Sequence, residues 1–434
     1  MALGAFMQAL EAAPSWRWSG RVVQVSGQII ESEGPLCSVG DCCEIISLNG
    51  SRFLAEIVGF RGTNVLSTPL QPASGIRFGD RVLSMGHAPK IRVGDELLGR
   101  VVNGEGIPID GMPPPRTHAR APLHRLPPSP MERAPIRTPL STGIRAIDGM
   151  LTTGQGQRVG IFGGSGVGKS TLIGMMTRNT SADVTVVGLI GERGREVREF
   201  LEDSLGEEGL RRSVTVVSTS DETPLQRMRA AMAATAIAEH FRDQGKNVLL
   251  VLDSLTRYCM AAREVGLAAG EPPSSKGYTP SVFAKLAQLV ERAGNSAQGS
   301  ITAFYTVLME GDDQQDPIVD AVRSMLDGHI VLSRQLAGEG VYPPIDILDS
   351  LSRLMSAVAG DQHKARALEI RRILGAYSRS ADMVRIGAYK AGSDAEIDLA
   401  LRHHSNLRNF FLQSAHESLT LPQTVDSMLN LDLS

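Results

Sequence analysis

One short segment has the residue types and spacing needed to hold a phosphate group. It fits the pattern G-x-x-x-x-G-K-[ST] with Gly163, Gly164, Ser165, Gly166, Val167, Gly168, Lys169 and Ser170. Glycines let such a loop curl so that successive backbone N–H groups point at an anion, and the helix that follows adds its positive dipole end. We expect Lys169 to lie against the β- and γ-phosphates of a nucleotide and the Ser170 hydroxyl to hold Mg²⁺.

The residues on either side supply the context that this motif requires. Residues 158–162 form an apolar run typical of a buried strand, and Thr171 opens a run, 171–176, with the character of the first turns of a helix. A strand–loop–helix order distinguishes a phosphate-binding loop from a glycine-rich turn that matches by chance. The sequence therefore predicts a site for a nucleotide.

Two other apolar runs end in carboxylates that suit the same chemistry. Residues 248–252 lead into Asp253, which we expect to support Mg²⁺ beside the loop, the alternative being an aspartate that caps the next helix. Residues 189–191 lead into Glu192, which could orient the water that attacks the γ-phosphate. Arg193 beside it could stabilise the transferred charge. Taken alone, Glu192 also fits a solvated loop acid, and Glu196 is expected to be structural or interfacial.

Composition limits the class of protein. The chain has 434 residues, which suggests about three domains, and its net charge of −3 gives no basic footprint for nucleic acid. Its four cysteines, Cys37, Cys42, Cys43 and Cys259, lack the spacing of a metal site, so we expect small buried residues of a reducing compartment. The absence of a secretory pattern and of a long apolar run predicts a cytoplasmic protein.

The chain divides by pattern into segments. Residues 1–17 form an N-terminal extension with the apolar spacing of a short amphipathic helix. Residues 18–90 show short alternating runs typical of a small β-barrel or sandwich domain, at 21–26, 28–32, 43–48, 53–60, 64–70 and 81–85. Prolines between 99 and 139 predict an extended connector packed on the surface through Leu123, Leu126, Met131 and Ile136.

The rest of the chain is predicted to be an α/β domain followed by helices. Five near-continuous apolar runs suit strands buried on both faces, at 184–190, 213–218, 247–252, 301–308 and 329–332. Helical segments lie between them, such as 225–244 and 282–292, so the sheet is expected to be parallel. The C-terminal segments 363–378, 381–388 and 395–413 have helical patterns. We place the nucleotide-binding domain, with its proline-rich connector, at 91–355 and a helical domain at 356–434.

These motifs resemble, in their order, the catalytic subunits of rotary ATPases. They comprise residues 142–148, the phosphate loop, 191–196, 253–258 and 342–346. Residues 303–317 and 386–394 resemble the branch that powers type III protein export, and the flagellar export ATPase more than its injectisome relatives. The resemblance covers about residues 18–434. It implies an N-terminal β-barrel, a RecA-like P-loop core of α/β class and a C-terminal helical domain.

The resemblance also implies roles for particular residues. Arg193 and Arg257 would contact the phosphate region, and Tyr342 would stack on adenine. Arg353 would enter the site of a neighbouring subunit in a homohexameric ring. Read without the resemblance, Tyr342 is a turn residue before two prolines, and Arg353 is an arginine on a helix surface.

The expected partners follow from the same resemblance. They are a regulator or stator protein at the N-terminus, a coiled-coil stalk in the central channel, the export gate at the inner membrane, and export substrates with their chaperones. The stalk would meet the loop at 270–278. The ATPase would be cytoplasmic and peripheral to the inner membrane at the export apparatus.

Four other functions remain as alternatives. They are an injectisome ATPase, an ATP-synthase-type subunit, an RNA-translocating hexamer and a nucleotide-binding ring subunit without activity. Base stacking by the third would need exposed aromatics in the N-terminal barrel, where residues 18–90 offer only Trp18, Phe53, Phe60 and Phe78. Lys169, Glu192 and Asp253 together argue against the fourth.

Overall fold

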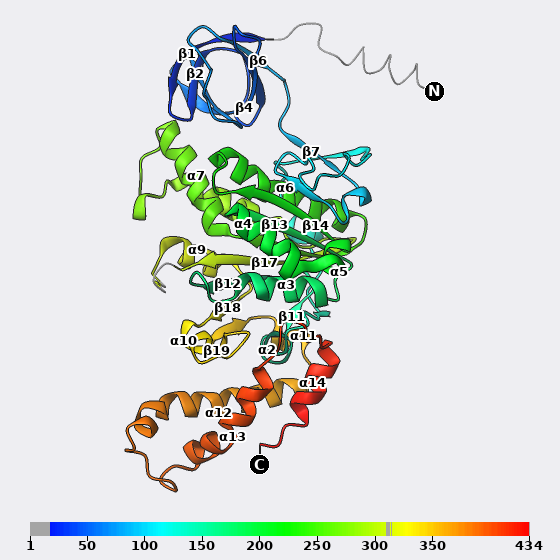
Figure 1. Ribbon diagram of the computed structural model, residues 1–434, viewed down its shortest axis with the longest axis vertical. Helices are drawn as coiled ribbons and strands as arrows, with labels where there is room; N and C mark the ends of the chain where they lie inside the picture. The colour runs from blue at the N-terminus through cyan, green and yellow to red at the C-terminus, as the bar shows by residue number, and fades with distance from the viewer. Residues whose placement is uncertain (1–17, 310–312, 314, 434) are drawn as a thin grey trace.

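The computed structural model describes residues 18–309, 313 and 315–433. Figure 1 shows an elongated molecule with the N-terminal β-barrel at one end, an α/β domain in the middle and a bundle of helices at the other end. This arrangement confirms the predicted fold class. The predicted N-terminal extension, 1–17, with its amphipathic helix, lies outside the described residues.

The first domain is a closed barrel of six strands in the order β1-β2-β5-β4-β3-β6. Its strands are β1 (Ser19–Ser26), β2 (Ile29–Glu33), β3 (Cys42–Ile46), β4 (Arg52–Arg61), β5 (Asn64–Pro69) and β6 (Arg81–Ser84). Small and branched apolar side chains, Cys43 and Ile45 among them, fill its interior. Of the two predicted architectures, the barrel is therefore the right one. All four cysteines are free, and Cys37 is only half-buried.

The proline-rich segment is more structured than the predicted extended connector. Strand β7 (Lys90–Val93) pairs with β9 (Ala119–Pro122), and β8 (Val101–Asn103) joins the edge of the central sheet beside β14. The two 3₁₀ turns of this segment are η1 (Asp95–Leu97) and η2 (Pro130–Glu132). Leu123 is buried, but Leu126 and Met131 are 85% and 93% exposed, so these two of the four named side chains do not pack the segment onto the surface.

The central domain is built on one sheet in the order β19-β18-β12-β17-β15-β13-β14-β8, with β16 paired to β17. Its strands are β12 (Arg158–Gly163), β13 (Val184–Glu192), β14 (Ser213–Thr219), β15 (Asn247–Asp253), β16 (Gly294–Asn295), β17 (Ser300–Leu308), β18 (Gly328–Leu332) and β19 (Ile345–Ser352). All pairings are parallel except those of β16 and β19. The predicted parallel sheet is confirmed. A separate pair joins β10 (Pro139–Leu140) and β11 (Thr153–Gly154).

Helices surround this sheet and explain why its strands are apolar throughout. They are α2 (Arg145–Met150), α3 (Lys169–Asn179), α4 (Gly194–Glu199), η3 (Phe200–Leu205), α5 (Gly206–Arg211), α6 (Pro224–Asp243), α7 (Leu255–Ala269), η4 (Ser275–Gly277), α8 (Pro280–Glu291), α9 (Pro317–Met325), α10 (Arg334–Gly338) and α11 (Met355–Val358). The longest, α6, begins where Thr223 and Gln226 form a capping box around Pro224. Eight of the nine residues of β13 are buried.

Three helices form the C-terminal domain: α12 (Asp361–Arg385), α13 (Ala395–Phe411) and α14 (Leu421–Leu429). The two helices predicted at 363–378 and 381–388 are one, because no glycine or proline interrupts the chain between them. The last helix was not predicted. Its sequence signal is the capping box of Thr420 and Gln423 with Pro422 in the first turn.

Candidate functional site

The phosphate-binding loop lies at the carboxyl edge of the central sheet. It connects the end of β12 to the start of α3, whose N-cap is Gly168. Gly166 and Gly168 have φ of 77° and 92°, in the left-handed region where a side chain would be strained. The side chain of Val167 is buried in the core, so only its backbone faces the loop's interior. The predicted strand–loop–helix context is present.

Lys169 is the first residue of α3 and lies within this loop. Its ammonium donates hydrogen bonds to the carbonyls of Gly163 at 3.0 Å and Gly164 at 3.1 Å. Burial lowers the pKa of Lys169, while the carboxylates of Asp253 and Glu192 act in the opposite direction. The ammonium is therefore held at the loop, facing the carboxylates of two other strands.

Asp253 ends β15 and is buried beside the loop. Its Oδ1 accepts a hydrogen bond of 2.5 Å from the hydroxyl of Thr306, on the neighbouring strand β17. Burial raises the pKa of Asp253, and the bond from Thr306 opposes that rise. The N-cap of α7 is Ser254, whose hydroxyl accepts from the backbone of Arg257, so the alternative that Asp253 caps this helix was wrong.

Glu192 ends β13, at the same edge of the sheet. Burial, the nearby Asp253 and a hydrogen bond with Glu196 raise the pKa of Glu192 from 4.5 to about 8, against the influence of Arg257. The Nε of Arg257 is buried, and the part of the chain that the structure describes offers it no hydrogen-bond partner. The carboxyl groups of Glu192, Asp253 and Glu196 are therefore close enough to compete for protons, and the guanidinium of Arg257 lies beside them. Such a perturbed group in a cleft is typical of a functional site.

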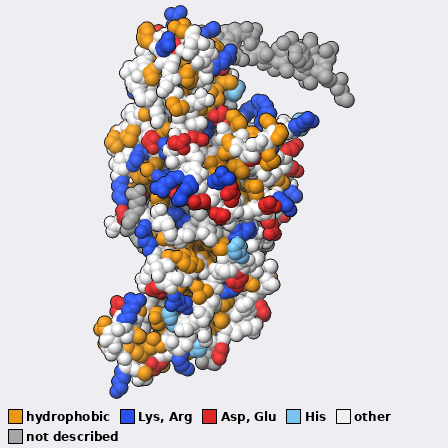
Figure 2. Space-filling model, viewed as in Figure 1, with side chains coloured by type: hydrophobic (Ala, Val, Ile, Leu, Met, Phe, Trp, Pro, Cys, Tyr) orange, Lys and Arg blue, Asp and Glu red, His pale blue; other side chains and the backbone are white. Residues whose placement is uncertain are grey.

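Arg193 lies at the rim of the site. Its side chain is 78% exposed and pairs with Glu196 at 3.3 Å. Figure 2 shows basic and acidic side chains gathered over the middle of the face in view, where α4 lies. The ion pair Arg195–Glu199 lies within that helix, and Arg198–Glu202 joins it to η3. The structure therefore places Arg193 less deeply than Arg257.

A cleft of about 340 Å³ brings most of the predicted residues together. It is lined by Ser165, Gly166, Gly168, Lys169, Ser170, Thr171, Glu192, Arg193, Glu196, Asp253, Ser254, Arg257 and Leu308. The sequence did not predict Glu196 as part of the site. It lies in the first turn of α4, which starts two residues after β13 ends, so a helical spacing from Glu192 could not have found it. Thr306 was also missed, because no local pattern links it to Asp253.

Tyr342 lies outside this cleft, between the central and C-terminal domains. It is 50% exposed, and its carbonyl accepts a hydrogen bond of 2.9 Å from the backbone N–H of Gln413. The side chain of Gln413 in turn donates to the carbonyl of Gly143, near the start of α2. Tyr342 is therefore held where the C-terminal domain meets the nucleotide-binding domain.

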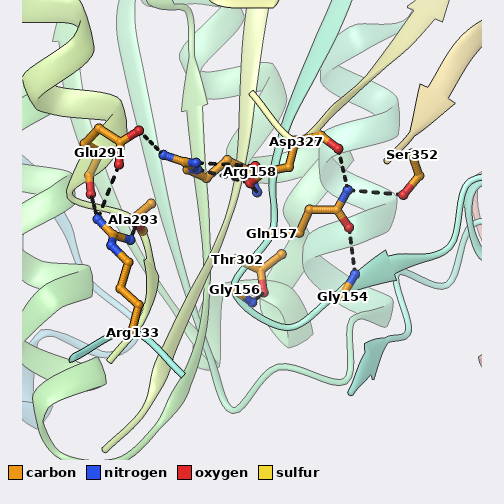
Figure 3. Close-up of polar contacts among 10 residues, drawn as sticks. All are labelled: Arg133, Gly154, Gly156, Gln157, Arg158, Glu291, Ala293, Thr302, Asp327 and Ser352. Carbon is orange, nitrogen blue, oxygen red and sulfur yellow. Dashed lines mark hydrogen bonds and ion pairs between the residues drawn. The ribbon is translucent and has the colours of Figure 1, made fainter. Parts of the chain in front are cut away.

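Arg353 lies at the opposite edge of the sheet from the loop. Its N–H donates to the carbonyl of Asp327, whose own N–H donates to the carbonyl of Arg158, the first residue of β12. Figure 3 shows this edge, where Gln157 donates to Ser352 and to Asp327, and Arg158 pairs with Asp327. The length of β12, about 20 Å at roughly 3.3 Å per residue, separates this edge of the sheet from the loop. Arg353 directly follows β19, so the alternative of a helix-surface arginine was wrong.

The cleft has the donors and acceptors that a magnesium nucleotide needs. Phosphate oxygens require N–H groups and cations, which the loop and Lys169 offer, and Mg²⁺ prefers oxygen ligands, which Ser170 and Asp253 offer. Among the residues that the structure describes, the buried carboxylate of Asp253 has one hydrogen-bond donor, Thr306, which leaves acceptor capacity. The residues present therefore fit this group.

Comparisons with known proteins agree with this geometry. A model of the ATP synthase alpha/beta family nucleotide-binding domain matches residues 143–352, the beta-barrel model of that family matches 22–86, and a model of the EscN ATPase C-terminal domain of type III secretion matches 359–430. A flagellum-specific ATP synthase of Bacillus subtilis is 48% identical over 427 residues, 98% of each chain. Its counterpart in Pseudomonas aeruginosa is 51% identical over 93% of this chain and 91% of the relative.

The chain belongs to the flagellar and type III secretion ATPase family. A solved structure of the assembled ATPase EscN from enteropathogenic E. coli, in complex with its central stalk EscO, has a TM-score of 0.87 at 46% identity and covers 94% of this chain and 98% of that one. The predicted family, fold and ATPase activity are thereby confirmed. In the part of this ATPase that the structure describes, no helix has the length and apolar character needed to cross a bilayer.

Proposed function

We propose that this ATPase is the motor of a flagellar-type export apparatus and that the cleft beside Lys169 is its hydrolytic site. The observation that carries the proposal is the position of Glu192, a carboxyl group with a raised pKa that faces the phosphate loop together with Asp253 and Arg257. A site that only bound nucleotide would have no need of a base across from the phosphates.

The roles of the residues follow from their positions. The loop's N–H groups and Lys169 bind the phosphates, and Arg257 neutralises charge on the oxygens of the transferred phosphoryl group. Glu192 orients a water molecule and accepts its proton as the water oxygen bonds to the γ-phosphorus and the bond to the bridging oxygen breaks, giving ADP and phosphate. Ser170 and Asp253 would hold Mg²⁺, which would supply positive charge to the phosphate oxygens. Arg193 assists from the rim.

One predicted residue fits the proposal only in an assembly. Arg353 is about one strand length from this chain's own loop, so its guanidinium is of use at a neighbour's site. We infer that it acts there, in a homohexameric ring, and that Tyr342 covers the adenine from the junction with the C-terminal domain. Such an arginine would couple phosphoryl transfer to ring assembly.

The partners we propose are those of an export machine. The loop at 270–278, between α7 and α8, would face the central channel and contact a coiled-coil stalk, in line with the EscN–EscO complex. In this structure Lys276 pairs with Asp313 at 2.7 Å and Asp316 at 3.3 Å, which ties the loop to a second segment. A regulator at the N-terminus, the export gate at the inner membrane, and cargo with chaperones complete the set.

The flagellar system is favoured over the injectisome and the ATP synthase. The two flagellar relatives are 48% and 51% identical to this chain, against 46% for EscN. The C-terminal domain matches the model of a secretion ATPase, which disfavours a synthase subunit. Genes for export or flagellar proteins beside its own would support this assignment.

ATPase activity measured against protein concentration, with electron microscopy of the same samples, tests the ring. Rings that appear together with a rise in specific activity support the proposal, and full activity in samples that contain only monomers contradicts it.

Mixed rings then test Arg353. Arg353→Ala and Lys169→Ala subunits are each expected to be inactive alone, whereas a mixture contains interfaces that pair an intact loop with an intact arginine. Partial recovery of activity on mixing supports action across the interface. Wild-type turnover by Arg353→Ala alone contradicts it, as does complete inactivity of mixtures shown to co-assemble.

A further inference from the structure

Gly164 occupies a position that the phosphate-loop motif leaves free and that its own backbone does not restrict to glycine. Unlike Gly166 and Gly168, it does not have positive φ. A side chain there would meet Arg334. A Cβ at Gly164 would lie 2.3 Å from the Nη2 of Arg334, 2.7 Å from its Nε and 2.8 Å from its Cζ. The guanidinium therefore lies directly against the start of the loop.

The sheet order explains how Arg334 reaches this place. Strand β18 pairs in parallel with β12, with Phe162 opposite Val331, so both strands end at the same edge. Ser333 then caps α10, and Arg334 is the first residue of that helix. Arg334 is not among the residues that line the cleft, so its guanidinium lies beside the loop without forming part of the cleft wall.

Two cations therefore flank the same peptide units. Lys169 donates to the carbonyls of Gly163 and Gly164, and Arg334 fills the space that a Cβ on Gly164 would take. The positive charge of Arg334 reaches the site, since it contributes to the lowered pKa of Lys169. A fixed positive charge beside the loop attracts an anion bound to that loop. The attraction increases with the negative charge of the anion.

We propose that Arg334 is a positioning residue of the phosphate site, which holds the start of the loop in its binding shape and strengthens the binding of triphosphate over diphosphate. The inference rests on the proposed role of the Lys169 loop. Arg334 does not line the cleft, so we expect its effect to fall on nucleotide affinity more than on turnover.

The first test titrates the full-length ATPase with fluorescent ATP and ADP analogues. Arg334→Gln is expected to weaken ATP binding about fivefold, the order of one partly screened charge, and ADP binding less. Arg334→Lys restores most of the preference for ATP, because it keeps the charge. The matched control is Gln335→Ala, on the next residue of α10, whose side chain is bonded to Glu339 and not to the loop. Equal losses for ATP and ADP, without rescue by lysine, would overturn the proposal.

The second test uses the contact itself. The guanidinium is the flexible end of a long side chain, so the methyl of Gly164→Ala displaces it at little cost to folding. Gly164→Ala and Arg334→Gln should therefore weaken ATP binding similarly, and the double variant should lose no more than about twofold beyond either. Losses that multiply would show that the two residues act independently, and the proposal would fall.

Lys169→Ala separates this inference from the function on which it rests. If Lys169→Ala keeps full affinity for ATP, the loop is not the phosphate site and both proposals fail. If Lys169→Ala abolishes binding while the Arg334 variants bind both nucleotides as the wild type does, only the inference about Arg334 fails. Thermal unfolding of each variant establishes that the protein compared is folded.

Discussion

Replacing Glu192 by glutamine is expected to abolish turnover and, at high pH, to stabilise the protein. The pKa of Glu192 is raised to about 8, mainly by burial and by the nearby Asp253. The ionised carboxylate that orients water is therefore the unfavourable form of this residue in the folded state. Glutamine keeps the size and hydrogen bonding of the side chain but never ionises.

The magnitude follows from the difference in pKa between the folded and unfolded states. A rise from 4.5 to about 8 corresponds to about 5 kcal/mol at 1.36 kcal/mol for each pKa unit. Because the side chain is partly exposed and solvent screens it, we expect roughly 2 kcal/mol. Folding raises the pKa of this acid, so the protonated form of Glu192 is the one that favours the folded state. The favourable contribution is complete below pH 4.5 and is lost as the pH rises through about 8.

Urea unfolding at pH 5 and pH 9 measures this difference, with ATP binding and phosphate release measured on the same samples. Glu192→Gln should match the wild type at pH 5, exceed its free energy of unfolding at pH 9, bind ATP and turn over very slowly. Glu199→Gln, an exposed acid on α4, is the matched control. If Glu192→Gln is less stable at both pH values and loses binding and turnover equally, Glu192 is a structural residue and the reasoning is refuted.

Three further predictions concern other parts of the molecule. Lys169→Ala should lose nearly all ATP hydrolysis and remain folded, because the Lys169 side chain is only partly buried and lies outside the apolar core. Wild-type phosphate release by the folded variant would contradict this. Cysteine at Ser274 or Ser275 should crosslink to a stalk protein within an assembled ring, and crosslinks found only to molecules outside the ring would count against a channel-facing loop. Glu56→Ala should lower the free energy of unfolding in urea by about 3 kcal/mol, because it leaves Arg229 as a buried unpaired charge. In the wild type the two side chains pair at 2.9 Å across the junction of barrel and core. A change under about 0.5 kcal/mol would show that the pair stabilises nothing.

The wild-type ATPase should also lose activity as the pH falls below about 8, since protonation of Glu192 removes the base. The pH profile of kcat/KM for the free enzyme measures this. A profile that stays flat from pH 9 to pH 6 would show that the ionisation of Glu192 does not limit the reaction.

The sequence by itself determined the elements that depend on short-range patterns. The phosphate loop needs glycines and a lysine at fixed spacing, and strands buried on both faces need unbroken apolar runs, so both can be recognised within about ten residues of chain. The carboxylates at the ends of β13 and β15 were recognised in the same way. The closed barrel was one of two architectures that its alternating strands allowed.

Only the tertiary structure decided which strand ends are neighbours and what surrounds each side chain. That Thr306 donates to Asp253 depends on β17 lying beside β15, and that Arg334 covers Gly164 depends on β18 lying beside β12. The proline-rich segment became part of the sheet because β14 had an edge for β8 to pair with. The raised pKa of Glu192 likewise arises from burial and from Asp253, 61 residues away in a chain where sequence distance does not predict proximity. Sheet order and burial are set by packing of the whole chain, and no local pattern encodes them.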